Sequence, residues 1–380
     1  MNILILCGTL LPQPSNNTNL LKKLLPHLTR EHTVRLLSPA PKTGPLPDTV
    51  DGVRVHWLHD DQRGPMRRLV FPAVARLVDR NGYSDALQTM VLIRRAMELR
   101  TEFPYDMVVG SMEPYPAGAA AAFLPFSGQR VLYLMDPPGM VCDENNDTPF
   151  RRRFLPRVLK RMDRVLTTPF IREALEKRGI TANFREVGFP MLEQHPHVPT
   201  PDDIPMSGDK IDLLFCGWLC SDLRSPKYFL ELARHLDERF RIVFMGKECE
   251  KLRERFDFDT RAEVVTLPNQ PYQVALNAMA SADILINIGN SIPVHMPSKT
   301  LEYINAGKPV VNFHKLPDCP TLHYTSRYPL CLNLFEGDPP DPERFIRFCL
   351  ENRGKTVPRP EIPECTPTFI AQTLLDEIGE

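Results

Sequence analysis

Short apolar runs alternate with amphipathic stretches along the first half of the chain. Residues 2–6 are apolar after Asn2, which is typical of a strand buried on both faces of a sheet. Residues 84–101 instead repeat their apolar positions with helical spacing. Strands that alternate with helices predict a parallel sheet joined by right-handed crossover connections. On this pattern we expect strands at 2–6, 33–37, 53–57, 107–110, 130–135 and 164–167, and helices at 18–28, 84–101, 116–124, 150–164 and 171–177.

The alternation stops at residues 188–208 and then starts again. This stretch contains five prolines and little periodicity, so we expect an interdomain linker at 191–208. Beyond it we expect strands at 210–217, 240–245, 263–266, 283–288 and 309–312, and helices at 226–235, 272–280, 298–305 and 367–380. The pattern therefore predicts an α/β protein with two Rossmann-like domains, at 1–190 and 209–355, and a tail at 356–380 that packs back toward the first domain.

Composition narrows the class of protein. A chain of 380 residues suits two domains, and it contains no apolar run long enough for a transmembrane helix. The first apolar run reaches Gly8 too soon for a signal peptide, and nine cysteines at scattered spacing favour reduced thiols. We therefore expect a cytoplasmic protein. The first half of the chain has more basic than acidic residues, and the second half has more acidic than basic residues. This asymmetry suggests a polyanionic partner for the first half.

The strongest motif is a strand, a loop and a helix within residues 283–311. Its loop and helix read Met-Pro-Ser-Lys-Thr-Leu-Glu-Tyr-Ile-Asn-Ala-Gly-Lys-Pro-Val-Val from Met296 onward. A proline suits the first helical position, and the free amides of the helix start, beside a lysine, predict an anion site. A glutamate one turn further along can accept two hydroxyls of a ribose. An ordinary capped helix with this glutamate in solvent stays open as the alternative. The residues concerned are Pro297, Ser298, Lys299, Thr300 and Glu302.

The stretch from Met296 to Val311 resembles the donor-binding element of retaining glycosyltransferases of GT-B fold, in their large family four. The resemblance is specific in this stretch, looser over residues 210–312, and limited to layout over residues 1–190. It implies a GT-B architecture, in which two Rossmann-like domains face each other across a cleft. It also implies that Glu302 binds the ribose of a nucleoside-diphosphate sugar and that Ser298 to Thr300 bind its diphosphate. A UDP-sugar is the donor that we expect from this family.

Two positions depart from the family pattern. The family often has a second glutamate eight residues before the first, and this chain has Val294 there. Asn290 and His295 are the nearest polar candidates for the sugar contact. In the family, an arginine follows the glycine turn after the first strand of the second domain. In this chain Gly217 is that glycine, and Trp218 stands in the place of the arginine. Arg224 and Lys227 are the expected substitutes, because their cations can bind phosphate oxygens.

Other candidates follow expected strands, as ligand-binding residues do in open parallel sheets. The resemblance implies that the loop around Asn269 holds the base, although a plain turn fits this sequence equally well. In the first domain, Glu113 and Asp136 could orient an acceptor hydroxyl or be turn residues. We recognise no Asp-x-Asp metal site and therefore expect no metal, and Gly8 does not begin a Gly-x-Gly-x-x-Gly loop, which disfavours a nicotinamide cofactor.

Residues 151–164 carry seven cations and one acid among apolar residues. Such a helix can lie on an anionic membrane surface, which would suit a lipid-linked acceptor at the inner membrane face. A solvated helix face is the open alternative, and no module accompanies the charge that would indicate nucleic-acid binding.

The function expected from these motifs is transfer of a sugar to a hydroxyl acceptor, with retention and without metal or other cofactor, as in cell-surface polysaccharide synthesis. The acceptor could be a glycan, a lipid-linked molecule or a small molecule. The alternatives are an inverting GT-B transferase, a sugar-nucleotide epimerase, or a non-catalytic binding protein of the same fold, which the loss at Val294 would favour.

Overall fold

The computed structural model divides the chain into two compact units. The first comprises Met1–Pro190 and Pro363–Glu380, and the second comprises Met191–Ile362. Within the part of the chain that is described, no helix is both long and apolar enough to cross a membrane. The described residues are 1–11, 15–41, 43–44, 46–59, 80–112, 115–138, 148–194, 204–206, 208–219 and 223–376.

The first unit is built on an eight-stranded sheet of order β3-β4-β2-β1-β5-β6-β7-β8, parallel except for the β3–β4 hairpin. The central strand β1 is paired on both sides and almost wholly buried, which explains its continuous apolar run. The strands are β1 (Asn2–Leu6), β2 (Thr33–Pro39), β3 (Thr49–Val50), β4 (Val53–Leu58), β5 (Met107–Ser111), β6 (Gln129–Leu134), β7 (Arg164–Thr167) and β8 (Phe184–Glu186).

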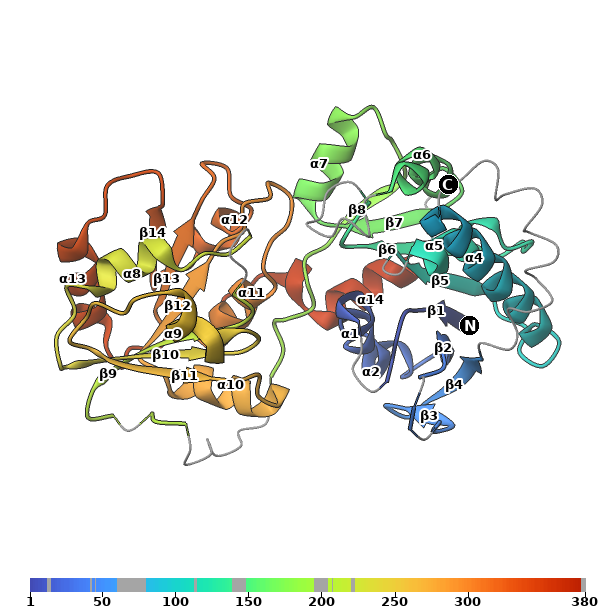
Figure 1. The fold of residues 1–380 in the computed structure, drawn as a ribbon. Helices are drawn as coiled ribbons and strands as arrows, with labels where there is room; N and C mark the ends of the chain where they lie inside the picture. The colour runs from blue at the N-terminus through green and yellow to red at the C-terminus, as the bar shows by residue number, and fades with distance from the viewer. Residues whose placement is uncertain are drawn as a thin grey trace. The chain divides into compact units, whose positions relative to one another are not determined.

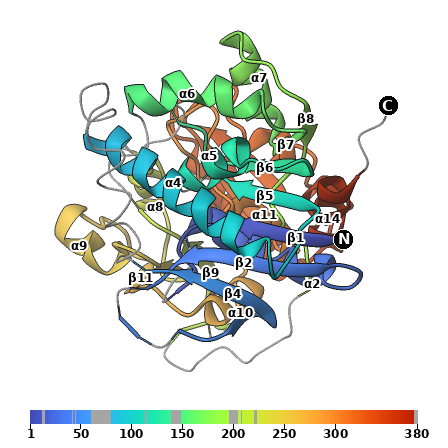
Figure 2. The same cartoon turned by 90° about the vertical axis from the view of Figure 1, so that its right-hand side faces the viewer.

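Helices α4, α5 and α6 pack together beside this sheet (Figure 1), and Figure 2 looks onto the face that α4 and α5 cover. Helix α5 lies close to β5 because Gly110 of the strand faces the glycine and alanines of the helix. A Cβ built on Gly110 would come within 2.8 Å of the Ala121 Cβ. The C-terminal helix α14 contacts α2 and β7. The helices are α1 (Asn16–Lys22), α2 (Leu25–Leu28), α4 (Arg80–Leu99), α5 (Tyr115–Phe123), α6 (Pro149–Leu159), α7 (Pro169–Lys177), the 3-10 turn η3 (Pro363–Cys365) and α14 (Pro367–Leu375).

The second unit has a six-stranded sheet of order β11-β10-β9-β12-β13-β14, in which every described pairing is parallel. The strands are β9 (Ile211–Cys216), β10 (Phe240–Met245), β11 (Glu263–Leu267), β12 (Ile284–Ile288), β13 (Val310–His314) and β14 (Cys331–Phe335). The helical segments are α8 (Lys227–Ala233), η2 (Cys249–Lys251), α9 (Leu252–Arg255), α10 (Tyr272–Ser281), α11 (Lys299–Asn305), α12 (Leu322–Thr325) and α13 (Pro342–Asn352).

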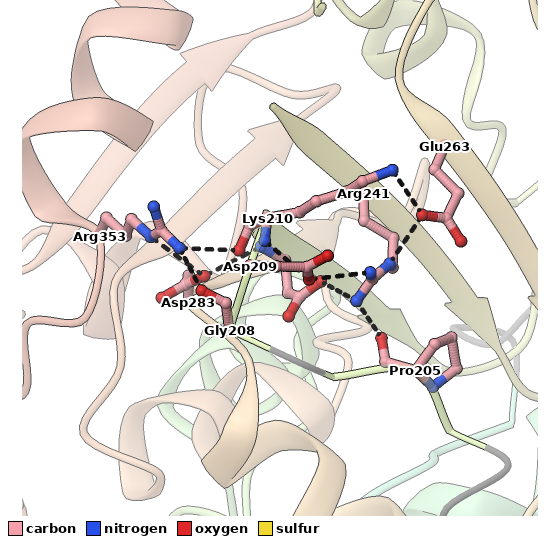
Figure 3. A network of polar contacts seen from close by, with 9 residues as sticks. Pro205, Gly208, Asp209, Lys210, Arg241, Glu263, Asp283 and Arg353 are labelled. Carbon is pink, nitrogen blue, oxygen red and sulfur yellow. Dashed lines mark hydrogen bonds and ion pairs between the residues drawn. The ribbon is translucent and has the colours of Figure 1, made fainter. Parts of the chain in front are cut away.

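The two ends of this second sheet differ in chemistry. Rings of Phe229, Phe313 and Phe345 meet in its core at centroid distances of 5.6–6.3 Å. At the amino end of the strands, buried Arg241 donates to Asp212 at 3.1 Å and to Glu263 at 3.1 Å (Figure 3). The same guanidinium donates to the backbone carbonyl of Pro205 and to Asp209, so this network ties the incoming chain to the sheet. The amino end is therefore occupied by internal ion pairs, whereas the candidate ligand residues lie at the carboxyl end.

The α/β pattern and both parallel sheets were expected, and the differences are local. The helix expected at 18–28 is broken into α1 and α2, and α6 ends at Leu159 rather than residue 164. Strand β14 and helix α13 were not expected. Alternate residues of β14 are buried at the sheet edge, so it lacks the continuous apolar run of a central strand.

Candidate functional site

The carboxyl end of the second sheet brings two glycine turns into contact. Gly217 follows β9 and Gly246 follows β10, and the Gly217 amide donates to the Met245 carbonyl at 2.9 Å. A Cβ built on Gly246 would lie 2.0 Å from the Gly217 carbonyl oxygen, and its φ is +136°. A glycine is required at 246 both by this approach and by its backbone conformation.

Helix α11 is fixed against the sheet by two of its side chains. The Tyr303 hydroxyl accepts from the Cys216 amide at 2.8 Å and donates to the Cys216 carbonyl at 3.0 Å. The buried Thr300 hydroxyl donates to Asn287 Oδ1 at 3.3 Å. All three bonds are made by buried groups, so the helix and the end of β9 are held in one arrangement.

Thr300 is anchored through a ladder of asparagines on three adjacent strands. Asn287, Asn312 and Asn333 are paired in register on β12, β13 and β14. Asn287 donates to Asn312 Oδ1 at 2.6 Å, and Asn312 donates to Asn333 Oδ1 at 2.8 Å. Thr325 also donates to Asn333 Oδ1, at 2.8 Å. These amides satisfy one another within a buried layer, and the layer positions the helix that carries the motif.

Lys299 and Glu302 form an ion pair on α11. The Lys299 Nζ donates to Glu302 Oε2, and the Glu302 side chain is only 5% exposed. Burial opposes the charge of Lys299, yet the Glu302 carboxylate holds the pKa of this lysine above its ordinary value. The ring of Tyr272 lies 5.6 Å from the same ammonium. Glu302 is therefore a buried carboxylate with a charged partner and not a solvated one, which excludes the alternative of an exposed glutamate.

The start of α11 differs from the expected one. Helix α11 begins at Lys299, so Pro297 precedes it and is not its first residue. The Thr300 amide donates to the Pro297 carbonyl at 3.1 Å, and no side-chain cap bond is made by Ser298. The expectation of a free amide at Thr300 was wrong, because a tight turn before this short helix uses it. The exit was expected correctly, since Gly307 has a φ of +70°.

A cavity of about 420 Å³ opens beside Glu302, within the second unit. It lies along α10 and α11, and most of its polar groups are amides and carboxylates. Asn305 helps to close it by donating to the Glu193 carbonyl at 2.9 Å. Glu302 is therefore one of the residues that a ligand in this cavity would contact. The polar residues lining this cavity are Glu193, Gln194, Gln273, Asn277, Glu302, Asn305 and Arg359.

Asn290 joins Arg224 to His295. The Arg224 Nε donates to Asn290 Oδ1 at 2.5 Å. The Asn290 Nδ2 donates to the His295 carbonyl at 2.7 Å and lies 2.9 Å from His295 Nδ1. Because an amide nitrogen can only donate, Nδ1 is the acceptor and Nε2 carries the proton of the neutral ring. Burial, aided by the nearby Arg224 cation, lowers the pKa of His295 to about 4. The cluster therefore presents a cation and a neutral N–H donor.

The loop that carries Arg224 is tied to the loop that carries Asn290. The Leu223 carbonyl accepts from the Ser291 amide at 3.3 Å and from Lys315 Nζ at 3.4 Å. Two loops about 65 residues apart in sequence are thereby held together. The structure thus unites three of the residues selected from the sequence.

Two other selected residues of the second unit are not part of this cluster. Lys227 is exposed at the start of α8, and Asn269 is exposed in the turn between β11 and α10. A cation that the sequence did not single out lies elsewhere on this edge. Lys247 Nζ is 4.7 Å from the centroid of the Trp218 ring, which is 40% exposed. Its position directly after the β10 glycine turn was the signal that could have identified it.

In the first unit, Asp136 follows β6 at the carboxyl end of that sheet. Burial raises the pKa of Asp136 to about 6, and a hydrogen bond from Asn17 partly offsets the effect. The raised pKa brings this carboxyl group closer to neutral pH than an ordinary aspartate, as suits a general base. Glu113, the other candidate of this unit, lies outside the described residues.

The basic segment 151–164 is less exposed than expected. Arg151 is 12% exposed and donates to the buried Asp85 at 2.6 and 2.8 Å, and Arg164 is completely buried in β7. Both were expected in the membrane-facing set, and burial removes them from it. The exposed cations are Arg152, Arg153, Arg157, Lys160 and Arg161.

No protein-family model matches this sequence, and no curated protein sequence matches it significantly. Solved structures do match in fold. The Anabaena protein Alr3699/HepE, in complex with UDP and glucose, has a TM-score of 0.63 at 14% identity, covering 99% of this chain and 96% of that chain. Sucrose-phosphate synthase from Thermosynechococcus elongatus has a TM-score of 0.64 at 14% identity, covering 98% and 94%. UDP-GlcNAc 2-epimerase from Methanocaldococcus jannaschii has a TM-score of 0.58 at 12% identity, covering 99% of both chains.

The fold is of the GT-B type. At these sequence identities the similarity concerns the fold alone and assigns no role to any residue of the site.

Proposed function

We propose that this protein is a glycosyltransferase that moves a sugar from a nucleoside-diphosphate sugar to a hydroxyl acceptor. The observation that carries the proposal is the arrangement at the carboxyl end of the second sheet. There the Lys299–Glu302 pair, the adjoining cavity and the Arg224–Asn290–His295 cluster offer groups for phosphate, hydroxyl and sugar contacts. The resemblance of the motif to family four and the fold shared with a protein solved with UDP and glucose support it.

In this proposal, Arg224 and Lys299 bind the diphosphate and Glu302 accepts the ribose hydroxyls. Lys227, Ser298 and the Gly217 turn add phosphate contacts, and Asn269 lies beside the base. The bond between the anomeric carbon and the diphosphate oxygen breaks, and the acceptor oxygen bonds to the same carbon. Cations at the leaving diphosphate stabilise the charge that develops there. The His295 Nε2–H, held by Asn290, donates to a sugar hydroxyl in place of the glutamate missing at Val294.

The finer features of the reaction are part of the proposal. Transfer proceeds with retention, the leaving phosphate oxygen takes the acceptor proton, and no metal is needed. UDP is the proposed carrier. Asp136, together with Glu113, orients the acceptor hydroxyl in the first unit.

We also propose a lipid-linked acceptor at the inner face of the cytoplasmic membrane. The exposed cations of α6 and the residues that follow it lie among aromatic rings, with Arg161 4.5 Å from the Phe123 ring centroid and Arg157 5.3 Å from that of Phe154. Phe123 is 37% exposed, so the surface offers an apolar group beside its cations. Co-sedimentation with anionic vesicles, and its loss in R157E/R161E, would support this contact, whereas equal binding to neutral vesicles would contradict it.

A second candidate is a sugar-nucleotide epimerase or an inverting transferase. The similarity in fold to UDP-GlcNAc 2-epimerase and the near-neutral titration of Asp136 favour it, because such reactions need a general base. A binding protein without activity is the third, since the family glutamate is replaced by Val294.

Thermal shift and product analysis test these candidates in turn. A ligand at about 100 times its Kd stabilises the folded state by about 2.7 kcal/mol, so UDP and UDP-sugars should raise Tm clearly. UDP release on addition of acceptor extracts, unaffected by EDTA, would support metal-free transfer. The NMR anomeric configuration of the product separates retention from inversion, and a changed sugar without acceptor indicates an epimerase. Absence of any shift with a panel of sugar nucleotides would refute the proposal.

A further inference from the structure

The cation at the proposed anion site of the second unit, Lys299, is already paired with an acidic side chain of the same helix. The Lys299 ammonium donates to the Glu302 carboxylate, and the two charges cancel on one face of α11. Glu302 is 5% exposed and Lys299 is 24% exposed, so solvent screens the pair only in part. An incoming phosphate therefore meets a lysine that already has an acidic partner.

The helix cannot relieve this competition by moving. Tyr303 is bonded to both backbone groups of Cys216, and Thr300 is bonded to the asparagine ladder through Asn287. Lys299 can turn toward a phosphate only by weakening its bond to Glu302. That change leaves a buried carboxylate with an unsatisfied charge, which is costly unless another donor replaces the ammonium.

A ligand can supply the replacement donor itself. The cavity beside Glu302 gives access to its carboxylate, so hydroxyls attached near a phosphate can donate there while the phosphate engages Lys299. A ribonucleoside diphosphate carries both groups. Inorganic pyrophosphate carries only the anion and leaves Glu302 without a donor.

We infer that Glu302 is a specificity-determining residue, which rejects anions that bring no hydroxyl donors and selects those that do. This inference rests on the proposed function and adds a role for the same carboxylate. When a simple phosphate binds Lys299, the buried Glu302 carboxylate is left unpaired, which weakens the binding of that phosphate. This effect adds to any hydrogen bond that Glu302 makes with the correct ligand.

Isothermal titration of the full-length protein with inorganic pyrophosphate and with UDP tests the inference. The variants are Glu302→Gln, which keeps the shape but removes the charge, and Glu263→Gln as the matched control. Glu263 also pairs with a lysine, Lys210 at 2.8 Å, but at the amino end of the sheet. Glu302→Gln should bind pyrophosphate about tenfold more tightly than the wild type, which corresponds to one charge-assisted hydrogen bond. UDP affinity should not rise with it, so the preference for UDP over pyrophosphate falls, and the control should leave both affinities unchanged.

Unchanged or weaker pyrophosphate binding by Glu302→Gln would overturn the inference, as would an equal gain for UDP. If circular dichroism shows that this variant is unfolded, Glu302→Asp provides the same test, because its shorter carboxylate also weakens the bond to Lys299. The proposed function fails separately, if the wild type binds no nucleoside diphosphate at all. Tighter pyrophosphate binding by the variant would then still support the internal competition.

Discussion

The contact between the two glycine turns predicts a large effect for Gly246→Ala. A Cβ at this position would lie 2.0 Å from the Gly217 carbonyl oxygen and 2.8 Å from its carbonyl carbon. No rotamer change can relieve this clash, because both partners are backbone atoms. The φ of +136° adds a conformational cost, since side chains with a Cβ rarely adopt it.

A matched variant separates the conformational part of the expected loss of stability from the steric part. Gly354 also has a positive φ, +67°, but a Cβ there would have no neighbour within 4 Å. Gly354→Ala should therefore cost about 1 kcal/mol, which is the conformational term alone. In Gly246→Ala the turns must also separate, which threatens the bonds from Gly217 to Met245 at 2.9 Å and from Gly246 to Leu267 at 3.2 Å. At about 1 kcal/mol for each bond, the total cost is about 3 kcal/mol.

Urea unfolding can measure both variants within the second unit. The chain has two tryptophans, and in a Trp57→Phe background the fluorescence of Trp218 reports on the second unit alone. Trp218 directly follows Gly217, so separation of the turns should also shift its emission before unfolding. Equal losses of stability in Gly246→Ala and Gly354→Ala would refute the steric argument. A loss confined to Gly246→Ala with unchanged UDP binding would show that the turn lies outside the binding site.

Three further changes follow from buried polar groups. In the unfolded chain His295 binds a proton below pH 6.5, whereas in the folded protein it does so only near its pKa of about 4. Protonation of the unfolded state therefore lowers the free energy of unfolding as the pH falls from 6.5 to about 4. His295→Gln should remove up to about 3 kcal/mol of this dependence, measured as the difference between the two urea-unfolding profiles from pH 7 to pH 4. Asn312→Leu should cost about 3 kcal/mol in urea unfolding, because its ladder partners lose buried hydrogen bonds, and a neutral result would contradict the ladder. Asp85→Ala should cost about 3 kcal/mol in urea unfolding by leaving Arg151, whose side chain is 12% exposed, without this carboxylate. Loss of the exposed Glu98 should cost less than about 1 kcal/mol.

The sheets were predictable because their central strands are buried on both faces. Strand β1 after Asn2 and strand β9 after Asp212 show this as apolar runs, which need no tertiary information to recognise. Strand β14 was not predicted because it lies at the sheet edge, where only alternate residues are buried and its central Asn333 is half-buried. Only the register of Asn333 with Asn312 explains that amide, and register is a property of the folded sheet.

The candidate site was predictable in its composition but not in its connections. Glu302 and Lys299 could be selected from one local motif, because helical spacing places them on the same face. The bond from Arg224 to Asn290 joins loops after different strands, and no local pattern specifies it. The position of Lys247 after its strand could be seen in the sequence, but its contact with Trp218 could not, since that contact depends on β9 and β10 being neighbours.

The two cations of the site are held by partners of different kinds, and this difference bears on how an anion binds. The Arg224 Nε donates to the neutral amide oxygen of Asn290. The Lys299 ammonium is bonded to a carboxylate, so its use requires a substitute donor for Glu302. Lys299 is thus suited to recognise a phosphate that arrives with hydroxyls. Removal of Arg224 should weaken UDP and pyrophosphate alike, whereas changes at Glu302 should alter the ratio between them. Both effects are measured as affinities for the same two ligands. If the Arg224 and Glu302 variants changed the affinities for UDP and pyrophosphate by the same factor, the site would distinguish ligands by charge alone.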